Sequence, residues 1–316
     1  MREWAMLIRP SLPSAKTLVS APPLAVYGPT EDPPELRGAL FQQERDGTVK
    51  ILRTSGQTSP TSPPDIGQDA AANGEVFISV NGIDQDWAGH RQQIKDWYHG
   101  GFSTGANWNR PIIGIHEGDR KTASDQVRIL KNTLILKVLQ SGFAPVDTVK
   151  KAAYQNDPSV KTIYDQLRQS LEVGRKVTLM AHSGGGSQVA LAMSILAREK
   201  DGLWEDAIGD KVRVMATAAT ATRDDLVRAG VKEENVFMTY SKKDAVPGFY
   251  RTPTDLRRPF SLLRAGVRGG YLRLREKMNP GPWHQGHYIF EHNMTPQGSR
   301  IVNFLEGGKS GTYPIA

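Results

Sequence analysis

Short apolar runs alternate with amphipathic stretches along the chain from residue 75 onward. Each run is rich in β-branched residues, which is typical of a buried strand. Strands are expected over residues 76–80, 111–116, 176–180, 212–216 and 235–240, the last of which is the final strand expected. Helices are expected over residues 87–98, 124–139, 160–171, 188–198, 224–229 and 295–305. The alternation predicts an α/β fold with a mostly parallel sheet and helices on both faces.

The longest expected helix has a clear apolar face. Apolar residues recur at helical spacing on one side of it. These residues are Val127, Leu130, Leu134 and Val138.

The first 74 residues differ from the rest, because they hold 10 of the 20 prolines and are rich in Ser, Thr and Gln. This composition predicts an extended N-terminal segment. One β-hairpin is expected inside it, since short apolar runs at residues 39–42 and 48–52 flank an Asp-Gly turn. The chain is therefore divided into a Pro-rich extension, residues 1–74, and an α/β domain, residues 75–316.

Composition excludes several classes of protein. Of 316 residues, 38% are apolar and 23% are charged, which fits a folded chain and not a disordered one. Cys is absent, which excludes disulfides, Cys-ligated zinc, iron–sulfur clusters and thiol catalysis. The apolar run before Arg9 is too short for a signal peptide, and no stretch is apolar enough to span a membrane. A cytoplasmic location is the default expectation, and export by a signal-less route stays open.

The candidate chemistry is concentrated after the strand at residues 176–180, where Ala-His-Ser-Gly-Gly, beginning at Ala181, leads into a helix. The spacing matches the nucleophile elbow G-x-S-x-G, with Ala181 in place of the first glycine. Small neighbours allow a strained turn that presents the Ser183 Oγ beside a helix N-terminus. Gly184 is the candidate to donate a backbone N–H to the oxyanion that forms when Ser183 attacks a carbonyl.

A serine nucleophile needs an acid and a base, and in folds with this elbow both follow it in the chain. Asp244 comes just after the last expected strand, at the sheet edge where catalytic groups gather. His287 is the first choice for the base, His284 the second and His292 the third. Two alternatives stay open: an ordinary surface turn at Asp244, and a metal site formed by these histidines with Glu291.

The loop after the first strand of the α/β domain is the expected source of a second oxyanion donor. Gly82 lets the backbone approach a substrate closely, and the N–H of Ile83 or Gly82 is the candidate donor. A plain tight turn at this Asn-Gly pair is the alternative. Among the other histidines, His182 is expected as a packed residue of the elbow and His90 as a solvated helix residue.

These features together resemble the α/β-hydrolase superfamily, and within it the lipase and esterase branch. The resemblance covers residues 75–306, and it differs from many members at Ala181 and at the Asn-Gly pair, where His-Gly is common. It implies a carboxylic ester hydrolase that forms an acyl-enzyme on Ser183, with His287 as the base and Asp244 orienting the imidazole. The expected substrate is a small-molecule or lipid acyl ester, and no cofactor and no metal are expected.

Two other kinds of function stay open. A serine peptidase or a thioesterase would use the same triad, and the sequence does not show the pocket that distinguishes them. A binding protein on the same scaffold, without catalysis, is the third alternative, although all three residue types of the triad are present.

The net charge of +7 is concentrated in one segment. Residues 245–283 carry eight Lys and Arg against two acidic residues, which amounts to +6, and they also carry several aromatic residues. The resemblance places such an insert over the active site as a basic cap. Arg257, Arg258, Arg264 and Arg268 are candidate contacts to an anionic membrane surface or an acidic substrate, with a solvated cover helix as the alternative. Nucleic acid is not expected as a partner.

Overall fold

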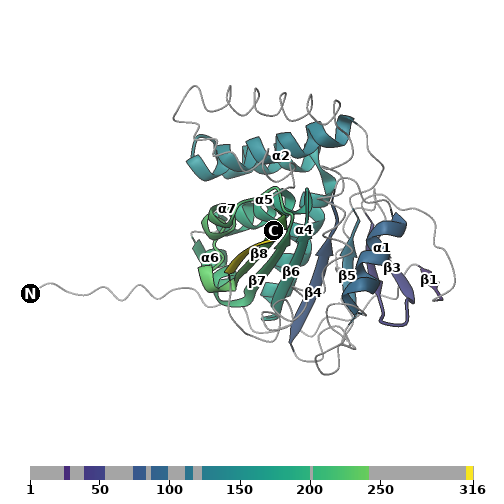
Figure 1. The fold of residues 1–316 in the computed structure, drawn as a ribbon. Coiled ribbons are helices and arrows are strands. Elements are labelled where there is room, and N and C mark those ends of the chain that lie inside the picture. Colours follow the sequence, from purple (N-terminus) through teal and green to yellow (C-terminus); the bar gives the residue numbers. More distant parts are fainter. Residues whose placement is uncertain are drawn as a thin grey trace, which may run out of the picture.

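A nine-stranded mixed sheet forms the centre of the protein, as a computed structural model shows (Figure 1). The structure describes residues 25–28, 39–53, 74–82, 87–98, 111–116, 123–199, 202–241 and 311–315. The strands are β1 (Ala25–Tyr27), β2 (Leu40–Gln43), β3 (Val49–Arg53), β4 (Glu75–Val80), β5 (Ile112–Ile115), β6 (Lys176–His182), β7 (Val212–Thr217), β8 (Val236–Ser241) and β9 (Gly311–Ile315). Their order across the sheet is β1-β3-β2-β5-β4-β6-β7-β8-β9.

The sheet has a parallel part and an antiparallel part. The strands from β5 to β9 in this order all run parallel to their neighbours, whereas β1, β3 and β2 are joined antiparallel at the β5 edge. The parallel strands are almost entirely buried, as expected when helices cover both faces of a sheet. The expected α/β class with a mostly parallel sheet is confirmed, as is each of the five expected strands.

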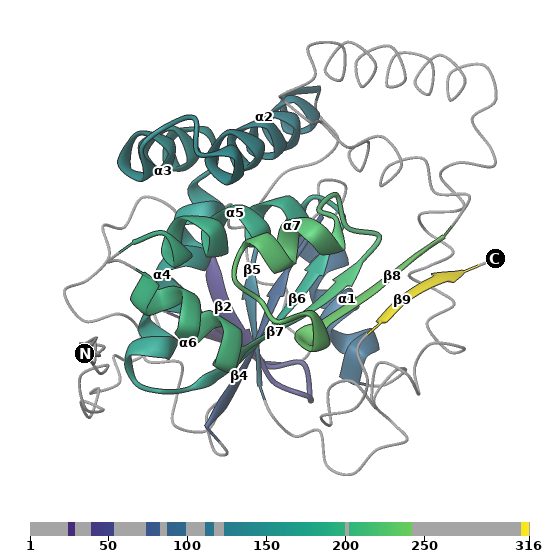
Figure 2. The ribbon, with the colours of Figure 1, turned by 90° about the vertical axis from the view of Figure 1, so that its left-hand side faces the viewer.

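Helices lie on both faces of this sheet (Figure 2). The described helices are α1 (Trp87–Asp96), α2 (Ala123–Ser141), α3 (Val146–Asn156), α4 (Pro158–Glu172), α5 (Gly185–Ala197), α6 (Leu203–Lys211) and α7 (Arg223–Arg228). They confirm the expected helices that begin at residues 87, 124, 160, 188 and 224, within a few residues at each end. The helix expected over residues 295–305 lies outside the described residues.

Two hydrophobic cores follow from the alternation of side chains along the strands. Ile78, Leu179 and Val214 belong to the larger core, which includes buried residues of α2, α4, α5 and α6. Met180 and Met215, one position along their strands, face the opposite way and pack in a second core with Trp87 of α1 and with aromatic residues that directly follow this helix. Period-two alternation therefore separates the sheet into an α5 face and an α1 face.

The expected hairpin is present, and it is part of the main sheet. Strands β2 and β3 pair antiparallel around a turn in which Gly47 has φ of 96°. The N–H of Thr48 donates to Asp46 Oδ1 at 2.8 Å, which stabilises the turn. Because β2 also pairs with β5, this part of the Pro-rich extension packs as strands of the α/β sheet.

The buried side of α2 differs from the apolar face expected for it. Val127 and Leu130 are 47% and 39% exposed, whereas Ile129, Leu136 and Leu139 are buried in the larger core. This helix has apolar residues on more than one side, and tertiary packing decides which side turns inward. The apolar face expected from Val127 and Leu130 is therefore not the side of α2 that is buried at these two positions.

Four elements, α3, α6, β1 and β9, are not predicted by the sequence pattern. Helix α3 buries only Val149 and Ala153, so its apolar periodicity is weak. Strand β9 corrects the expectation that the strand near residues 235–240 is the last one. It contains Pro314, and a proline in a sequence is evidence against a central strand. An edge strand such as β9 tolerates proline.

A buried carboxylate joins three of the helices that cover the α5 face. Asp157 caps the N-terminus of α4 by accepting the Ser159 N–H at 3.0 Å. Its other oxygen accepts Asn132 Nδ2 of α2 and Gln188 Nε2 of α5, both at 2.7 Å. Because each oxygen is bonded, the carboxylate can stay buried without an unmet hydrogen-bonding demand. The N-terminal half of α5 is thereby fixed to its neighbours.

Among the helices in the described part of the chain, none combines the length and the apolar character needed to cross a lipid bilayer.

The contact between Gly114 of β5 and Phe41 of β2 gives a stability prediction. A Cβ at residue 114 would lie 2.0 Å from the Phe41 ring, which is fully buried. Gly114→Ala is therefore expected to lower the free energy of unfolding by about 1–3 kcal/mol, because the ring must move within a packed core. Urea denaturation followed by circular dichroism measures this change.

Gly209→Ala in α6 is the matched control. Its new Cβ has no neighbour closer than 3.4 Å, and alanine is the better helix former. A Gly114→Ala protein as stable as the Gly209→Ala protein would contradict the packing of β2 against β5.

Candidate active site

The candidate site lies at the carboxyl edge of the sheet, between β4 and β6. The chain passes from β4 to β5 on one side and then returns across β4 to β6 on the other. In open α/β sheets, ligands bind outside the carboxyl ends of the strands at the point where the strand order reverses in this way. Here that position is occupied by Asn81 and Gly82, which follow β4, and by Ser183, which follows β6.

Ser183 has the strained backbone that a nucleophile elbow requires. It joins β6 to α5 with φ of 48°, a left-handed conformation that non-glycine residues rarely adopt. Ser183 is 3% exposed, so the residue is largely removed from bulk water. Strain of this kind costs about 1–3 kcal/mol and persists only where the surroundings enforce it, which makes it a marker of functional turns.

Three glycines surround Ser183 where no side chain fits. A Cβ on Gly82 would lie 2.6 Å from the Ser183 Cβ and 3.3 Å from its Oγ. A Cβ on Gly185 would lie 2.7 Å from the Val80 carbonyl oxygen, and one on Gly186 would lie 2.6 Å from the Ala219 Cβ. The elbow therefore packs closely against the end of β4 and against the loop after β7, and the small residues leave no space for side chains between them.

Helix α5 begins immediately after the nucleophile candidate. Gly184 is its N-cap residue, and all residues from Gly185 to Ala197 are buried. The first N–H groups of a helix have no partner within the helix and carry the positive end of its dipole. Because the N–H groups of Gly186 and Ser187 are bonded to the carbonyl oxygens of Ser183 and Gly184, the Gly184 and Gly185 N–H groups are the candidates to stabilise an anion that forms beside Ser183.

Backbone hydrogen bonds fix the Ser183 peptide groups to β7. The Ser183 N–H donates to the Thr217 carbonyl oxygen at 3.0 Å. The Ser183 carbonyl oxygen accepts the N–H of Gly186 at 3.1 Å and that of Thr220 at 2.9 Å. The turn is thus held by its own helix and by the loop after β7.

Three buried histidines lie on the α1 face beneath the elbow. His90 Nε2 shares a 2.8 Å hydrogen bond with Ser79 Oγ, and its ring stacks on that of His116 at 5.8 Å between centroids. Burial, together with the neighbouring His116 and His182, holds the pKa of His90 well below its ordinary value. His90 is therefore a neutral ring that joins α1 to β4, and the expectation of a solvated His90 is wrong. The expectation of a packed His182 is confirmed.

The structure brings together only some of the residues predicted for the site. Ser183, Gly184 and Gly82 meet at the carboxyl ends of β4 and β6. The other predicted site residues lie outside the described residues. They are Ile83, Asp244, His284, His287 and His292 with Glu291, and the basic residues Arg257, Arg258, Arg264 and Arg268. Within the described ranges, no group of three or more His, Asp or Glu side chains is arranged to hold a metal ion.

Sequence reasoning missed the residues that support the elbow from β7. Ala218 follows β7 with φ of 47°, and its N–H donates to the Thr239 carbonyl oxygen at 2.8 Å, so it repeats the geometry of Ser183 one strand along. Thr220 contacts the Ser183 carbonyl oxygen. The only signal in the sequence is a run of small residues and threonines after β7, which is also common in ordinary turns.

Comparison with protein-family models, with curated proteins and with solved structures finds no significant match to this chain. The α/β class and the elbow therefore rest on the structure and the sequence themselves.

The paired left-handed residues give a second stability prediction. Ala218→Gly is expected to raise the free energy of unfolding by about 0.5–1 kcal/mol, because relief of left-handed strain exceeds the added chain entropy of glycine. For the same reason, Ser183→Gly is expected to be more stable than Ser183→Ala by a similar amount. Urea titration of the four proteins, wild type included, measures both differences.

The same change in a helix interior serves as the control. Ala207→Gly in α6 is expected to lose about 1 kcal/mol, since glycine is a poor helix former. If Ala218→Gly destabilised the protein as much as Ala207→Gly does, the left-handed conformation after β7 would be ruled out.

Proposed function

We propose that this protein is a serine hydrolase of the α/β-hydrolase type that cleaves carboxylic esters, with Ser183 as its nucleophile. The observation that carries the proposal is the strained Ser183 turn, which lies at the switch point of a parallel sheet with Gly82 packed against its Cβ. A structural serine in an ordinary turn needs neither the left-handed backbone nor the exclusion of side chains around it. A nucleophile elbow, by contrast, requires both a sharp turn at the serine and small residues beside it.

In the proposed reaction, the Ser183 Oγ attacks the ester carbonyl carbon and its proton passes to a histidine base. The carbonyl oxygen becomes an oxyanion, which the Gly184 N–H and the backbone at Gly82 and Ile83 would stabilise. Collapse of this intermediate expels the alcohol, which takes the proton from the base. Water activated by the same base then releases the acid and restores the Ser183 hydroxyl.

Asp244 and His287 are the proposed acid and base. Strand β8 ends at Ser241, three positions before Asp244 in the sequence, and it runs parallel to β6 with β7 between them. The carboxyl ends of these strands lie at one edge of the sheet, so the chain leaves β8 on the side of the sheet that carries Ser183. His287 enters the proposal through the resemblance to serine hydrolases and the order Ser, Asp, His.

Replacement of the nucleophile is the direct test. Ser183→Ala is expected to lower kcat for a short p-nitrophenyl ester by about four orders of magnitude or more, since the covalent route is lost. Labelling by a fluorophosphonate probe, mapped by mass spectrometry, is expected at Ser183 in the wild type and at no residue in the variant. Ser194→Ala is the matched control, because Ser194 is a buried serine of α5 away from the turn. This variant is expected to keep both ester hydrolysis and labelling at Ser183.

The same experiment separates the competing functions. Undiminished ester hydrolysis by Ser183→Ala would contradict the assignment, and a wild type with neither labelling nor hydrolysis would favour a binding protein on this scaffold. A panel of ester, thioester and amide substrates with equal acyl groups then distinguishes an esterase from a thioesterase or a peptidase by kcat/KM.

The absence of a side chain at Gly82 gives a further prediction. Gly82 does not have a positive φ, so alanine fits its backbone, but the new Cβ would press on Ser183 and on His182 Nδ1. Gly82→Ala is expected to lower kcat/KM by about a hundredfold, because a displacement of the nucleophile by a fraction of an ångström disrupts the attack geometry.

Gly114→Ala provides the matched comparison, since it introduces a similar clash elsewhere in the sheet. Both variants are assayed below their unfolding transitions. An equal loss of activity in the two would mean that the effect at Gly82 is general destabilisation and not contact with the nucleophile.

A further inference from the structure

Thr220 forms a bridge between the Ser183 carbonyl group and the first turn of α5. Its Oγ1 donates to the Ser183 carbonyl oxygen at 3.2 Å and accepts the Ser187 N–H at 3.2 Å. Its own N–H donates to the same Ser183 oxygen at 2.9 Å. Thr220 is 1% exposed, so these contacts are shielded from competing water.

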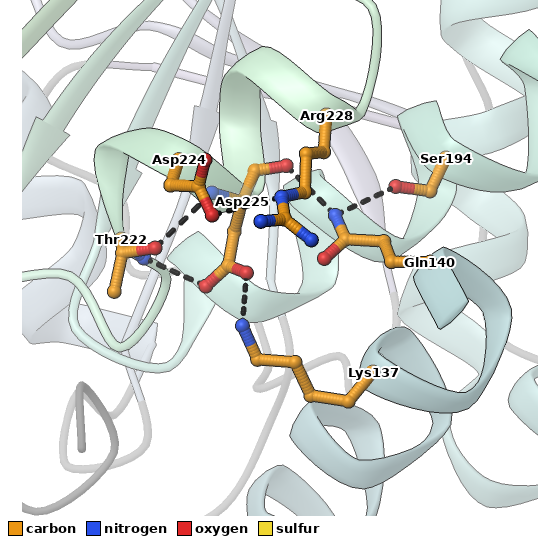
Figure 3. A network of polar contacts seen from close by, with 7 residues as sticks. All are labelled: Lys137, Gln140, Ser194, Thr222, Asp224, Asp225 and Arg228. Carbon is orange, nitrogen blue, oxygen red and sulfur yellow. Dashed lines mark hydrogen bonds and ion pairs between the residues drawn. The ribbon is translucent and has the colours of Figure 1, made fainter. Parts of the chain in front are cut away.

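The loop that carries Thr220 is held in place independently of the elbow. It begins with the left-handed Ala218 and ends at Thr222, which caps α7 through reciprocal hydrogen bonds with Asp225. Figure 3 shows the Asp225 carboxylate facing Lys137 of α2, with which it forms an ion pair.

A second residue of α2, Gln140, also contacts Asp225. Gln140 Nε2 donates to the Asp225 carbonyl oxygen at 2.9 Å, so side chains from two consecutive turns of α2 hold the start of α7 (Figure 3). Because α7 is anchored in this way, the preceding loop gives Thr220 a fixed position from which to act on Ser183.

The peptide between Ser183 and Gly184 transmits this contact to the site. A trans peptide is planar, so its carbonyl oxygen and its N–H point in opposite directions and turn together. The described chain contains no cis peptide, so this geometry applies to the Ser183–Gly184 unit. A group that fixes the Ser183 carbonyl oxygen therefore also fixes the direction of the Gly184 N–H, which is the proposed oxyanion donor.

From this geometry we propose that Thr220 is a positioning residue: its hydroxyl, in addition to the backbone N–H groups of Gly186 and Thr220 that bond the same oxygen, holds the orientation of the Gly184 N–H, and of the strained Ser183 turn, for transition-state stabilisation. The inference rests on the proposed function. Thr220 does not touch the substrate, and it acts only through the Ser183–Gly184 peptide. A misdirected donor weakens the bond to the oxyanion more than it weakens substrate binding, so the effect falls on kcat and leaves KM nearly unchanged.

Thr220→Val, which keeps the shape and removes the hydroxyl, tests this inference. We expect a loss of about ten- to a hundredfold in kcat and in the rate of fluorophosphonate labelling, with KM changed by less than about threefold. Thr220→Ser, which restores the hydroxyl, is expected to recover at least about a third of the wild-type kcat. If the valine variant does not fold, Thr220→Ala replaces it.

Thr133→Val is the matched control, since Thr133 is a buried threonine whose Oγ1 donates to a backbone oxygen, that of Ile129, at 3.0 Å in α2. It is expected to keep kcat within about twofold of the wild type while losing stability comparably to Thr220→Val. A Thr220 variant that folds and keeps wild-type kcat and labelling, or a Thr220→Ser protein as impaired as Thr220→Val, would overturn the inference. Failure of the proposed function would instead show as a wild type that is not labelled at Ser183.

Discussion

The close approach of the carboxyl ends of β4 and β6 is the constraint on which the rest of the site depends. Gly82 lies against the Ser183 Cβ, and Gly185 lies against the Val80 carbonyl oxygen, so two backbones meet where side chains would normally separate them. Only glycine permits this contact at both positions. It places the start of α5, directly after Ser183, at the switch point of the sheet.

The strain in this contact is sustained by the neighbouring strand. Ser183 and Ala218 follow β6 and β7 in matching registers, and each donates its N–H to the strand beyond. The loop after β7 is itself held by the capping of α7 and by the ion pair of Asp225 with Lys137. The left-handed backbone conformation of Ser183 is therefore enforced by contacts with several neighbouring elements. Strained backbone persists only where its surroundings hold it in this way.

Features encoded by residues that are close together in the sequence could be predicted. Features that depend on contacts between distant parts of the chain could not. Buried parallel strands appear as apolar runs, and the elbow at Ser183 is encoded by adjacent small residues, so both can be inferred from a single sequence. The burial of His90, in α1, depends on Ser79 of β4 and on His116, which directly follows β5. The outward position of Val127 depends on what packs against α2, and no periodicity argument contains that information.

The contact between Gly82 and Ser183 also links the site to the folding reaction. Strands β4 and β6 are neighbours in the sheet, yet β5 and four helices separate them along the chain. Pairing of this kind closes a long loop and is slow compared with helix formation. The serine acquires its strained geometry only when that loop has closed. In a refolding experiment, the return of the hydrolase activity proposed for Ser183 would therefore time the joining of the two central strands, separately from the earlier recovery of helical signal.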